Sequence, residues 1–223
     1  MTSAQLASAR LLSLALLLAS SGPVVAQDAA RMRPRMTAVN WENGKAYFFQ
    51  GSQYLRFDIG SDRPDSGYPQ PIAAWRLPWA GDLDAVVTWG NGKAYVFRGD
   101  QYVRFDVKGD SVDAGYPQPT ASWRFPWQGG IDAAVNWGNG KAYFFKGSQY
   151  VRFDIASDRI DSGYPQPISQ WHLPWNEDVD SVVNWGNGKV YIFKGGQYVR
   201  FDIASDRVDP GYPRPTSEWR LPF

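Results

Sequence analysis

The segment DAVVTWGNGKAYVFRGDQYVRFDV (residues 84–107) decides the fold, because it holds three short strand patterns separated by turns. Residues 84–89 are rich in β-branched side chains, which favour extended backbone. In residues 93–98 and 101–107 the side chains alternate between two faces, as they do along a strand. The segment therefore predicts a small antiparallel meander that is apolar on both faces.

The connections between these runs are typical of turns. Asn91-Gly92 separates the first two runs, and Asn-Gly favours a type I′ hairpin turn, which needs positive φ at both central residues. Residues 110–113 can add a short fourth strand. The stretch Gly-Tyr-Pro-Gln-Pro at 115–119 is expected to break the sheet, and residues 121–123 can form a helical turn after it.

This unit occurs four times in succession with a period of 48 residues, in copies that span 36–83, 84–131, 132–179 and 180–223. Two of the repeating markers are the tryptophans Trp41, Trp89, Trp137 and Trp185 and the Gly-Tyr-Pro triplets at Gly67, Gly115, Gly163 and Gly211. A fixed period of this length indicates a repeat architecture in which neighbouring units complete each other's core. A sheet that is apolar on both faces needs a neighbour on each side, and an open stack would expose two aromatic faces. We therefore expect an all-β, four-bladed β-propeller whose blades are four-stranded antiparallel meanders.

The first 26 residues lie outside the repeats and have the pattern of a secretory signal peptide. Arg10 precedes an apolar run, and small residues lead to Val24-Val25-Ala26. The apolar run is too short to span a membrane. We expect cleavage after Ala26, a short leader at 27–35, and a secreted or periplasmic propeller at 36–223.

Charge and cysteine content exclude some classes of partner and fold. The whole chain has 23 Lys and Arg against 22 Asp and Glu, and removal of residues 1–26 takes away one Arg, so the remaining chain is nearly neutral. Such a balance steers the protein neither to nucleic acid nor to an anionic membrane. The sequence has no cysteine, so disulfides cannot stabilise this exported fold.

The patterns DAAV, KAYFFKG, YVRFD and GYPQPI, shown most fully by residues 132–175, resemble the hemopexin-like repeat, and the resemblance covers 36–223. The family includes the haem carrier hemopexin, vitronectin, the substrate-docking domain of matrix metalloproteinases, plant seed albumins, and bacterial and fungal single-domain proteins. The family ties its first and fourth blades with a disulfide. Here packing must close the ring, and we expect Phe223, at the position of Trp79, Trp127 and Trp175, to contribute to it.

The resemblance also implies ions in the central channel, bound by backbone groups of the first strand of each blade. It places a cation at the carbonyls of Met36, Asp84, Asp132 and Asp180, and an anion such as chloride at the amides of Ala38, Val86, Ala134 and Val182. Oxygen ligands suit a hard cation such as Ca²⁺, and the three Asp side chains add negative potential. The alternative is that these Asp side chains pair with nearby donors and that folding needs no ion.

Two further repeated sets are expected to be structural. Arg56 and Asp58 share one face of a strand, and since buried charges must be paired, they and their copies predict ion pairs between strands or blades. The tryptophans in the segment that follows the sheet are expected to pack blade against blade, with a sugar-binding surface as the alternative. These tryptophans are Trp75, Trp123, Trp171 and Trp219.

His172 is the single histidine of the chain, and it stands where other copies have Arg76, Arg124 and Arg220. A neutral imidazole can ligate haem iron or a transition metal, so His172 is the candidate for haem binding. One histidine cannot supply two ligands within a monomer, but a pocket shared by two copies would make the chain a homodimer. Nothing around His172 reads as a nucleophile elbow, so the sequence predicts a protein that is not an enzyme.

The leading hypothesis is a secreted, non-catalytic binding module with a structural, calcium-like cation in its channel and a protein, glycan or small molecule on its loop surfaces. Haem or metal scavenging and a lectin with repeated aromatic pockets are the alternatives. Function is expected where the four copies differ. These positions are Met36, Glu42, Lys108-Gly109, His172, Asn176-Glu177-Asp178, Pro210 and Arg214.

Overall fold

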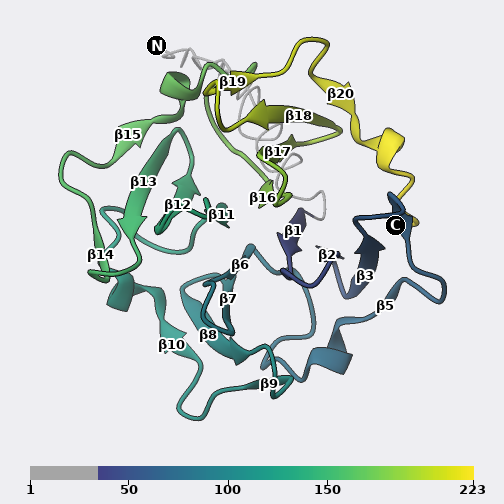
Figure 1. The fold of residues 1–223 in the computed structure, drawn as a ribbon. Helices are drawn as coiled ribbons and strands as arrows, with labels where there is room; N and C mark the ends of the chain where they lie inside the picture. The colour runs from purple at the N-terminus through teal and green to yellow at the C-terminus, as the bar shows by residue number, and fades with distance from the viewer. Residues whose placement is uncertain (1–34) are drawn as a thin grey trace, which may run out of the picture. The chain divides into compact units, whose positions relative to one another are not determined.

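The computed structural model describes residues 35–223, which form four antiparallel sheets arranged as blades around a common axis (Figure 1). The predicted four-bladed propeller is confirmed. The predicted signal peptide and the leader up to residue 34 lie outside the described residues. Blade 1 holds β1–β5 and the short helix η1, blade 2 holds β6–β10 and η2, blade 3 holds β11–β15 and η3, and blade 4 holds β16–β20 and η4.

Each blade starts at the axis and builds outward through three well-formed strands. The innermost strands are β1 (Met36–Asn40), β6 (Ala85–Thr88), β11 (Ala133–Asn136) and β16 (Ser181–Asn184). The second strands are β2 (Lys45–Gln50), β7 (Lys93–Arg98), β12 (Lys141–Lys146) and β17 (Lys189–Lys194). The third strands are β3 (Gln53–Asp58), β8 (Gln101–Asp106), β13 (Gln149–Asp154) and β18 (Gln197–Asp202).

Short elements complete the outer part of each blade. The fourth strands are β4 (Arg63–Pro64), β9 (Ser111–Val112), β14 (Arg159–Ile160) and β19 (Arg207–Val208). The fifth are β5 (Gln70–Pro71), β10 (Gln118–Pro119), β15 (Gln166–Pro167) and β20 (Arg214–Pro215). They are followed by the 3₁₀ helices η1 (Ile72–Trp75), η2 (Thr120–Trp123), η3 (Ile168–Trp171) and η4 (Thr216–Trp219).

Two local predictions need correction. The turn between β6 and β7 is not a two-residue type I′ turn, because the amide of Trp89 donates to the carbonyl of Lys93 at 2.8 Å and the pair encloses three residues. Positive φ therefore falls on Gly90 and Gly92 rather than on Asn91. The stretch 115–119 does not leave the sheet entirely, since β10 returns to pair with the start of β8, while β9 pairs with its end.

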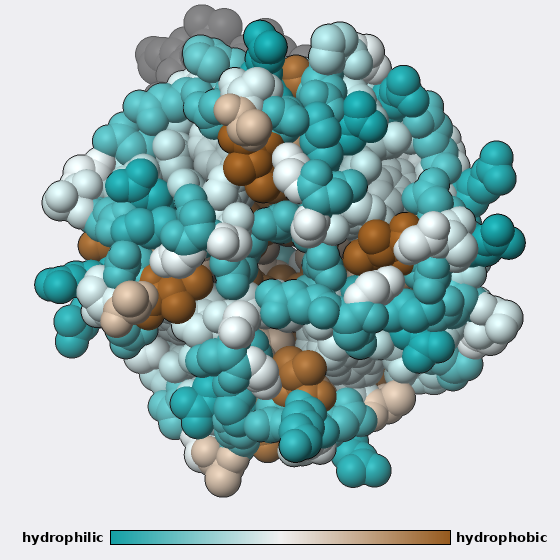
Figure 2. Space-filling view, in the orientation of Figure 1, coloured by the Kyte–Doolittle hydropathy of each residue, from teal (hydrophilic) through white to brown (hydrophobic). Residues whose placement is uncertain are grey.

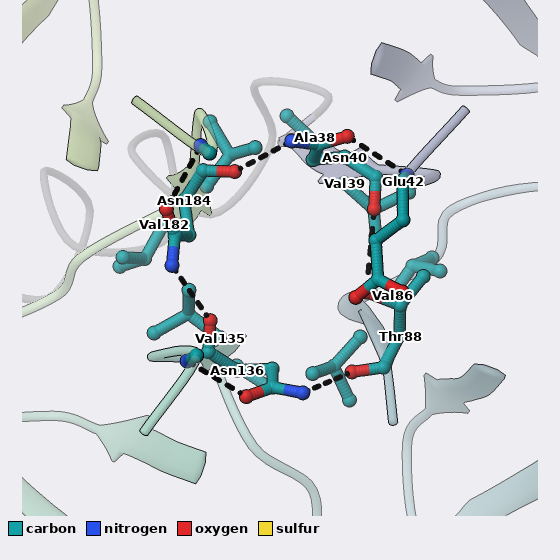
Figure 3. A pocket seen from close by; sticks show the side chains of 15 residues that line it. Ala38, Val39, Asn40, Glu42, Val86, Thr88, Val135, Asn136, Val182 and Asn184 are labelled. Carbon is teal, nitrogen blue, oxygen red and sulfur yellow. Dashed lines mark hydrogen bonds between the residues drawn. The ribbon is translucent and has the colours of Figure 1, made fainter. Parts of the chain in front are cut away.

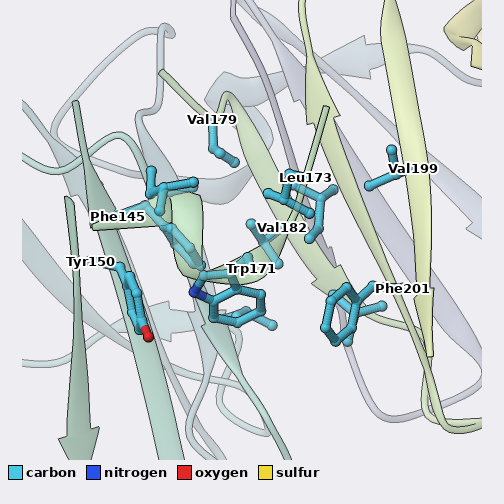
Figure 4. Packing of buried hydrophobic residues seen from close by; sticks show 13 residues of the cluster. Phe145, Tyr150, Trp171, Leu173, Val179, Val182, Val199 and Phe201 are labelled. Carbon is cyan, nitrogen blue, oxygen red and sulfur yellow. The ribbon is translucent and has the colours of Figure 1, made fainter. Parts of the chain in front are cut away.

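The blades are joined by the tryptophan that ends each 3₁₀ helix, whose ring packs against a phenylalanine of the next blade. Figure 4 shows Trp171 between Phe145 of its own blade and Phe201 of the next. The ring centroids lie 5.4 Å apart for Trp75 and Phe105, 5.4 Å for Trp123 and Phe153, 5.5 Å for Trp171 and Phe201, and 5.6 Å for Trp219 and Phe57. The last pair runs from blade 4 back to blade 1. The predicted blade-to-blade role of these tryptophans is confirmed, and the same contact closes the ring.

The prediction that Phe223 contributes to this closure was wrong. Its side chain is 39% exposed, whereas Trp219 and Leu221 pack into the cluster that joins blade 4 to Phe48 and Phe57 of blade 1. The apolar contact is therefore already complete at Leu221, two residues before Phe223.

These contacts predict that the closing interface is as important as the others. We expect Trp219→Ala to lower the free energy of unfolding by about 3 kcal/mol, similar to Trp171→Ala, because each truncation leaves a cavity between two blades. Chemical denaturation followed by tryptophan fluorescence checks this. Phe223→Ala is the control and should change the value by less than about 0.5 kcal/mol. A Trp219→Ala protein as stable as the wild type would show that the ring closes by other means.

Candidate functional site

The four innermost strands surround a channel on the propeller axis. In each of them, alternate backbone groups pair with the second strand, as Trp89 does with Lys93. Because pairing alternates along an antiparallel ladder, the intervening amides point away from the second strand and toward the channel. These amides belong to Ala38, Val86, Ala134 and Val182, the four residues predicted for the anion site.

At the end of these strands, four side chains form a closed circle of hydrogen bonds, which we call the Asn mouth (Figure 3). The side-chain amide of Asn40 donates to the carbonyl of Asn184 at 3.1 Å. The side-chain amide of Asn184 donates to the backbone carbonyl of Asn136 at 3.2 Å, and the side-chain amide of Asn136 donates to the backbone carbonyl of Thr88 at 3.1 Å. The hydroxyl of Thr88 donates to the carbonyl of Asn40 at 3.2 Å and completes the circle. Each blade is thus tied to its predecessor, including blade 1 to blade 4.

The asparagine side chains are held in place by their own turns. The Oδ1 atom of Asn40 accepts from the amide of Glu42 at 2.9 Å, and Asn136 and Asn184 accept from Gly138 and Gly186, each at 3.0 Å. Both ends of each side-chain amide are therefore used, which fixes the rotamer and the direction of the circle.

Blade 1 breaks the fourfold symmetry of the Asn mouth at Glu42. The equivalent residues are Gly90, Gly138 and Gly186, whose φ values are 74°, 83° and 81°. Glu42 has φ 60°, a conformation that costs a residue with a side chain about 1–2 kcal/mol. Its Oε1 lies 3.3 Å from the hydroxyl of Thr88, which itself replaces an asparagine. The two departures from the repeat therefore meet at one point of the mouth.

The channel opens at the Asn mouth into a cavity of about 180 Å³. Figure 2 shows the hollow at the centre of one face of the ring, with mostly hydrophilic residues around it. Glu42 is the one residue with a charged side chain among those that line the cavity, and the other polar lining groups are neutral. The cavity therefore presents carbonyl oxygens and one carboxylate at the Asn mouth, and the channel amides of Val86, Ala134 and Val182 deeper inside.

The other end of the channel, the Asp mouth, is formed by the starts of the four strands. Oδ2 of Asp84, Asp132 and Asp180 accepts from the amide of the glycine that follows the second strand, at 2.5, 2.6 and 2.5 Å. These hydrogen bonds hold three carboxylates in equivalent positions. In blade 1 the equivalent residue is Met36, so the ring of acids has one gap.

A residue that the sequence reasoning missed, Arg35, reaches into the Asp mouth. Its Nη1 donates to Oδ1 of Asp132 at 2.8 Å, and its Nε lies 3.6 Å from Oδ1 of Asp180. Burial is the largest single influence on Arg35 and works against its charge, but the hydrogen bond to Asp132 and the negative charges of Asp132, Asp180 and Asp84 together outweigh it and raise the arginine pKa. Burial raises the pKa of Asp84 and Asp180, and Arg35 opposes that rise.

Arg35 could have been noticed from the repeat, because the equivalent residues are the buried aliphatic residues Leu83, Ile131 and Val179. The position of Arg35 affects whether the Asp mouth can hold the predicted calcium-like cation. Carbonyl and carboxylate oxygens suit a hard cation, but a guanidinium already lies among the carboxylates, so the two cations would compete for the same negative charge. The residues at this mouth fit an arginine better than a metal ion.

The predicted anion site also departs from fourfold symmetry. The amide of Ala38 donates to Oγ of Ser181 in the neighbouring blade at 2.8 Å. Ser181 is buried and stands where blades 2 and 3 have Ala85 and Ala133. One of the four channel amides is therefore already hydrogen-bonded to a side chain of this protein.

The repeated charged residues form ion pairs within each blade. Arg152 pairs with Asp161 at 2.5 Å, and Lys141 bridges Asp154 and Asp161 at 2.6 and 3.0 Å. Arg56 likewise pairs with Asp65 and not with Asp58. The predicted pairing between strands is confirmed, but the partner within the blade is different and the pairs are partly exposed. The reason is that the fourth strand ends beside the third and brings a second aspartate close to the arginine.

His172 lies on the surface, next to the end of η3, with φ 50°. The described residues contain no cluster of three or more His, Cys, Asp or Glu side chains that could hold a metal ion. His172 therefore belongs to no such cluster, and its role in haem binding stays a prediction. No helix within residues 35–223 is long and apolar enough to cross a membrane.

Comparison with known sequences identifies the family. The Hemopexin family pattern matches residues 37–78, 83–126, 131–174 and 179–222, one match in each blade. The chain therefore belongs to the hemopexin family. Human Matrix metalloproteinase-25 is 47% identical over 34 residues, which are 15% of this chain and 6% of that protein, so this chain matches only a small part of its length.

Solved plant proteins share the fold at low sequence identity. The hemopexin fold protein CP4 from cow pea has a TM-score of 0.71 and 21% identity, and the match covers 84% of this chain and 95% of CP4. LS24, a seed albumin from Lathyrus sativus, has a TM-score of 0.70 and 23% identity over 83% and 93% of the two chains. A plant lectin with two metal binding sites from Cicer arietinum has a TM-score of 0.70 and 22% identity over 82% and 93%.

The lysine–aspartate pairs predict an acid limit to stability. The hydrogen bond from Lys141 lowers the pKa of Asp154, and that from Lys189 lowers the pKa of Asp202. Because the folded pKa lies below the ordinary value of about 4, this stabilisation is present above pH 4 and is lost as the pH falls below it. We expect the Tm, measured by circular dichroism, to decrease when the pH is lowered below about 4. The fall should be smaller in Lys141→Gln/Lys189→Gln, and an equal fall would assign the acid response to other groups.

The haem hypothesis predicts a shifted Soret band when the purified protein is titrated with haemin. The shift should saturate at one haem per chain, or at one per two chains if two copies share the pocket. His172→Ala should abolish it, because the imidazole would be the iron ligand. Binding that is unchanged in this variant would remove His172 from the site.

Proposed function

We propose that this protein is a secreted, non-catalytic binding module that takes a small cationic group, such as an alkylammonium, into the Asn mouth of its channel. The observation that carries the proposal is Glu42, a carboxylate held at positive φ at the rim of the cavity where the other three blades have glycine. Strained residues that persist against a local cost are concentrated at functional sites.

The charge and shape of the mouth support a cationic ligand. Glu42 supplies a formal negative charge, and the carbonyl oxygens of the hydrogen-bonded circle each retain a free lone pair. A cavity of about 180 Å³ is smaller than the roughly 300–1,000 Å³ that encloses a drug-sized molecule. It fits the end of a side chain or a small organic cation better than a complete cofactor.

The use of the repeated side chains supports a module without catalysis. The acidic residues at the end of the third strand and just after the fourth are engaged by lysine and arginine, as in the Lys141, Asp154 and Asp161 network. The tryptophans that a lectin site would need as stacking platforms are packed between blades, as Trp75 and Trp171 are. A lectin function stays a prediction that glycan binding would test.

Titration with n-butylammonium, a mimic of a lysine side chain, tests the proposed site by calorimetry. We expect saturable binding at one site per chain and no binding of n-butanol, which has the same shape without the charge. Glu42→Gly should weaken binding at least about tenfold, the equivalent of 1.4 kcal/mol. The same variant should be no less stable than the wild type, because glycine adopts positive φ without strain.

Glu177→Gln is the matched control, since it removes an exposed carboxylate that does not line the cavity. It should leave the affinity for n-butylammonium unchanged. Equal affinities in wild type and Glu42→Gly would contradict the proposal, as would an equal loss in both variants, because general charge would then explain the binding.

A further inference from the structure

We propose that this propeller supplies its own substitutes for channel ions: the guanidinium of Arg35 serves as the cation of the Asp mouth, and the hydroxyl of Ser181 takes up part of the ring of channel amides. The part about Arg35 concerns the opposite end of the channel from Glu42, whereas Ser181 binds the amide of Ala38, which lines the same cavity as Glu42. Neither part depends on the proposed ligand. It replaces the predicted calcium and chloride with side chains of the chain itself.

Two adjacent departures from the repeat support the role of Arg35. Blades 2 to 4 have an aliphatic residue followed by Asp at this point, whereas blade 1 has Arg35 followed by Met36. The change to Met36 removes one carboxylate from the mouth, and the change to Arg35 adds a fixed positive charge. Both changes reduce the net negative charge that would otherwise attract a divalent ion.

The contacts of Arg35 place its charge where a channel cation would have to be. It precedes blade 1, yet it contacts Asp132 of blade 3 and Asp180 of blade 4. Blade 3 lies opposite blade 1 in the ring (Figure 1), so the side chain extends across the mouth. A guanidinium stays charged at all physiological pH values and carries several donors in one plane, which allows it to serve two carboxylates at once. A metal ion in the same ring would have to displace it.

Ser181 takes the place of an anion at the ring of channel amides, which lies deeper in the channel than the Asp mouth. Its Oγ accepts the amide of Ala38 across the junction of blades 4 and 1, at 2.8 Å. A hydroxyl oxygen satisfies a buried amide that would otherwise need an anion or water. Alanine in the same place, as at Ala85 and Ala133, has no acceptor to offer.

Both substitutes contact blade 4, which meets blade 1 at a junction that has no disulfide in this chain, and Arg35 also contacts blade 3. Arg35 links the entry of blade 1 to blades 3 and 4, and Ser181 links blade 4 to Ala38. The ring is thus fastened by groups that no chelator or dialysis can remove.

Thermal unfolding of the purified protein tests the proposal in EDTA and in calcium chloride, at constant ionic strength. The Tm of the wild type should be the same in both. Arg35→Gln should lower the Tm in EDTA by about 2–4 °C, the shift that a loss of about 1 kcal/mol produces in a domain of this size. Calcium should restore part of that loss, because three carboxylates are left without a counter-charge. Arg124→Gln, which removes an exposed arginine, should behave as the wild type.

The anion part is tested by replacing chloride with gluconate. The Tm of the wild type should be the same in both salts. The Tm of Ser181→Ala should be lower than that of the wild type in gluconate, and chloride should restore part of the difference. The variant introduces the residue that blades 2 and 3 already contain, so it preserves the packing.

Three results would overturn the proposal. One is a calcium-dependent rise in Tm that is as large in the wild type as in Arg35→Gln. Another is an Arg35→Gln protein as stable in EDTA as the wild type. The third does not depend on any variant: stoichiometric metal in the wild type after gel filtration without added ions, measured by elemental analysis, would show that the Asp mouth holds a metal.

Discussion

The contact on which the whole structure depends is the insertion of a tryptophan from each short helix between two blades. Each of these rings lies against a phenylalanine of the next blade at nearly the same distance, and the fourth contact returns to the first blade. Apolar burial is the main favourable term in folding, and here it is available only when a neighbour is present. A single blade could not bury Trp171 or Phe201, so the four blades stabilise one another as a ring.

The ring places four equivalent residues around the channel axis at each level. A position where one copy has a different residue therefore points to a role other than folding. Where the copies agree, side chains serve the fold, as the asparagines of the Asn mouth do. Where they differ on the axis, the changed side chain has a partner: Glu42 meets Thr88 at one mouth, and Arg35 meets the repeated acids of blades 3 and 4 at the other. Unpaired changes of this kind would leave a strained or uncompensated group, so paired changes are the ones that a symmetric channel tolerates.

Membership of the hemopexin family defines the scaffold, but the chemistry of the channel belongs to this chain. The solved plant proteins share the propeller at 21–23% identity, which establishes the common fold. Side chains such as Arg35, Ser181 and Glu42 are properties of the individual sequence. They change the charge and hydrogen bonding of the two channel mouths while the packing between blades stays the same.

The sequence by itself determined the propeller, its four blades and the packing role of the tryptophans, because a 48-residue period and alternating apolar residues leave few other ways to bury both faces of a sheet. It also singled out Glu42 and Met36 as departures from the repeat. Only the tertiary structure decided what these residues meet. Arg35 and Asp132 are 97 residues apart, and Ser181 and Ala38 are 143 residues apart. Such contacts arise when the ring closes, since closure brings the start of blade 1 beside blade 4, and no local pattern records which side chains then fall within hydrogen-bonding distance.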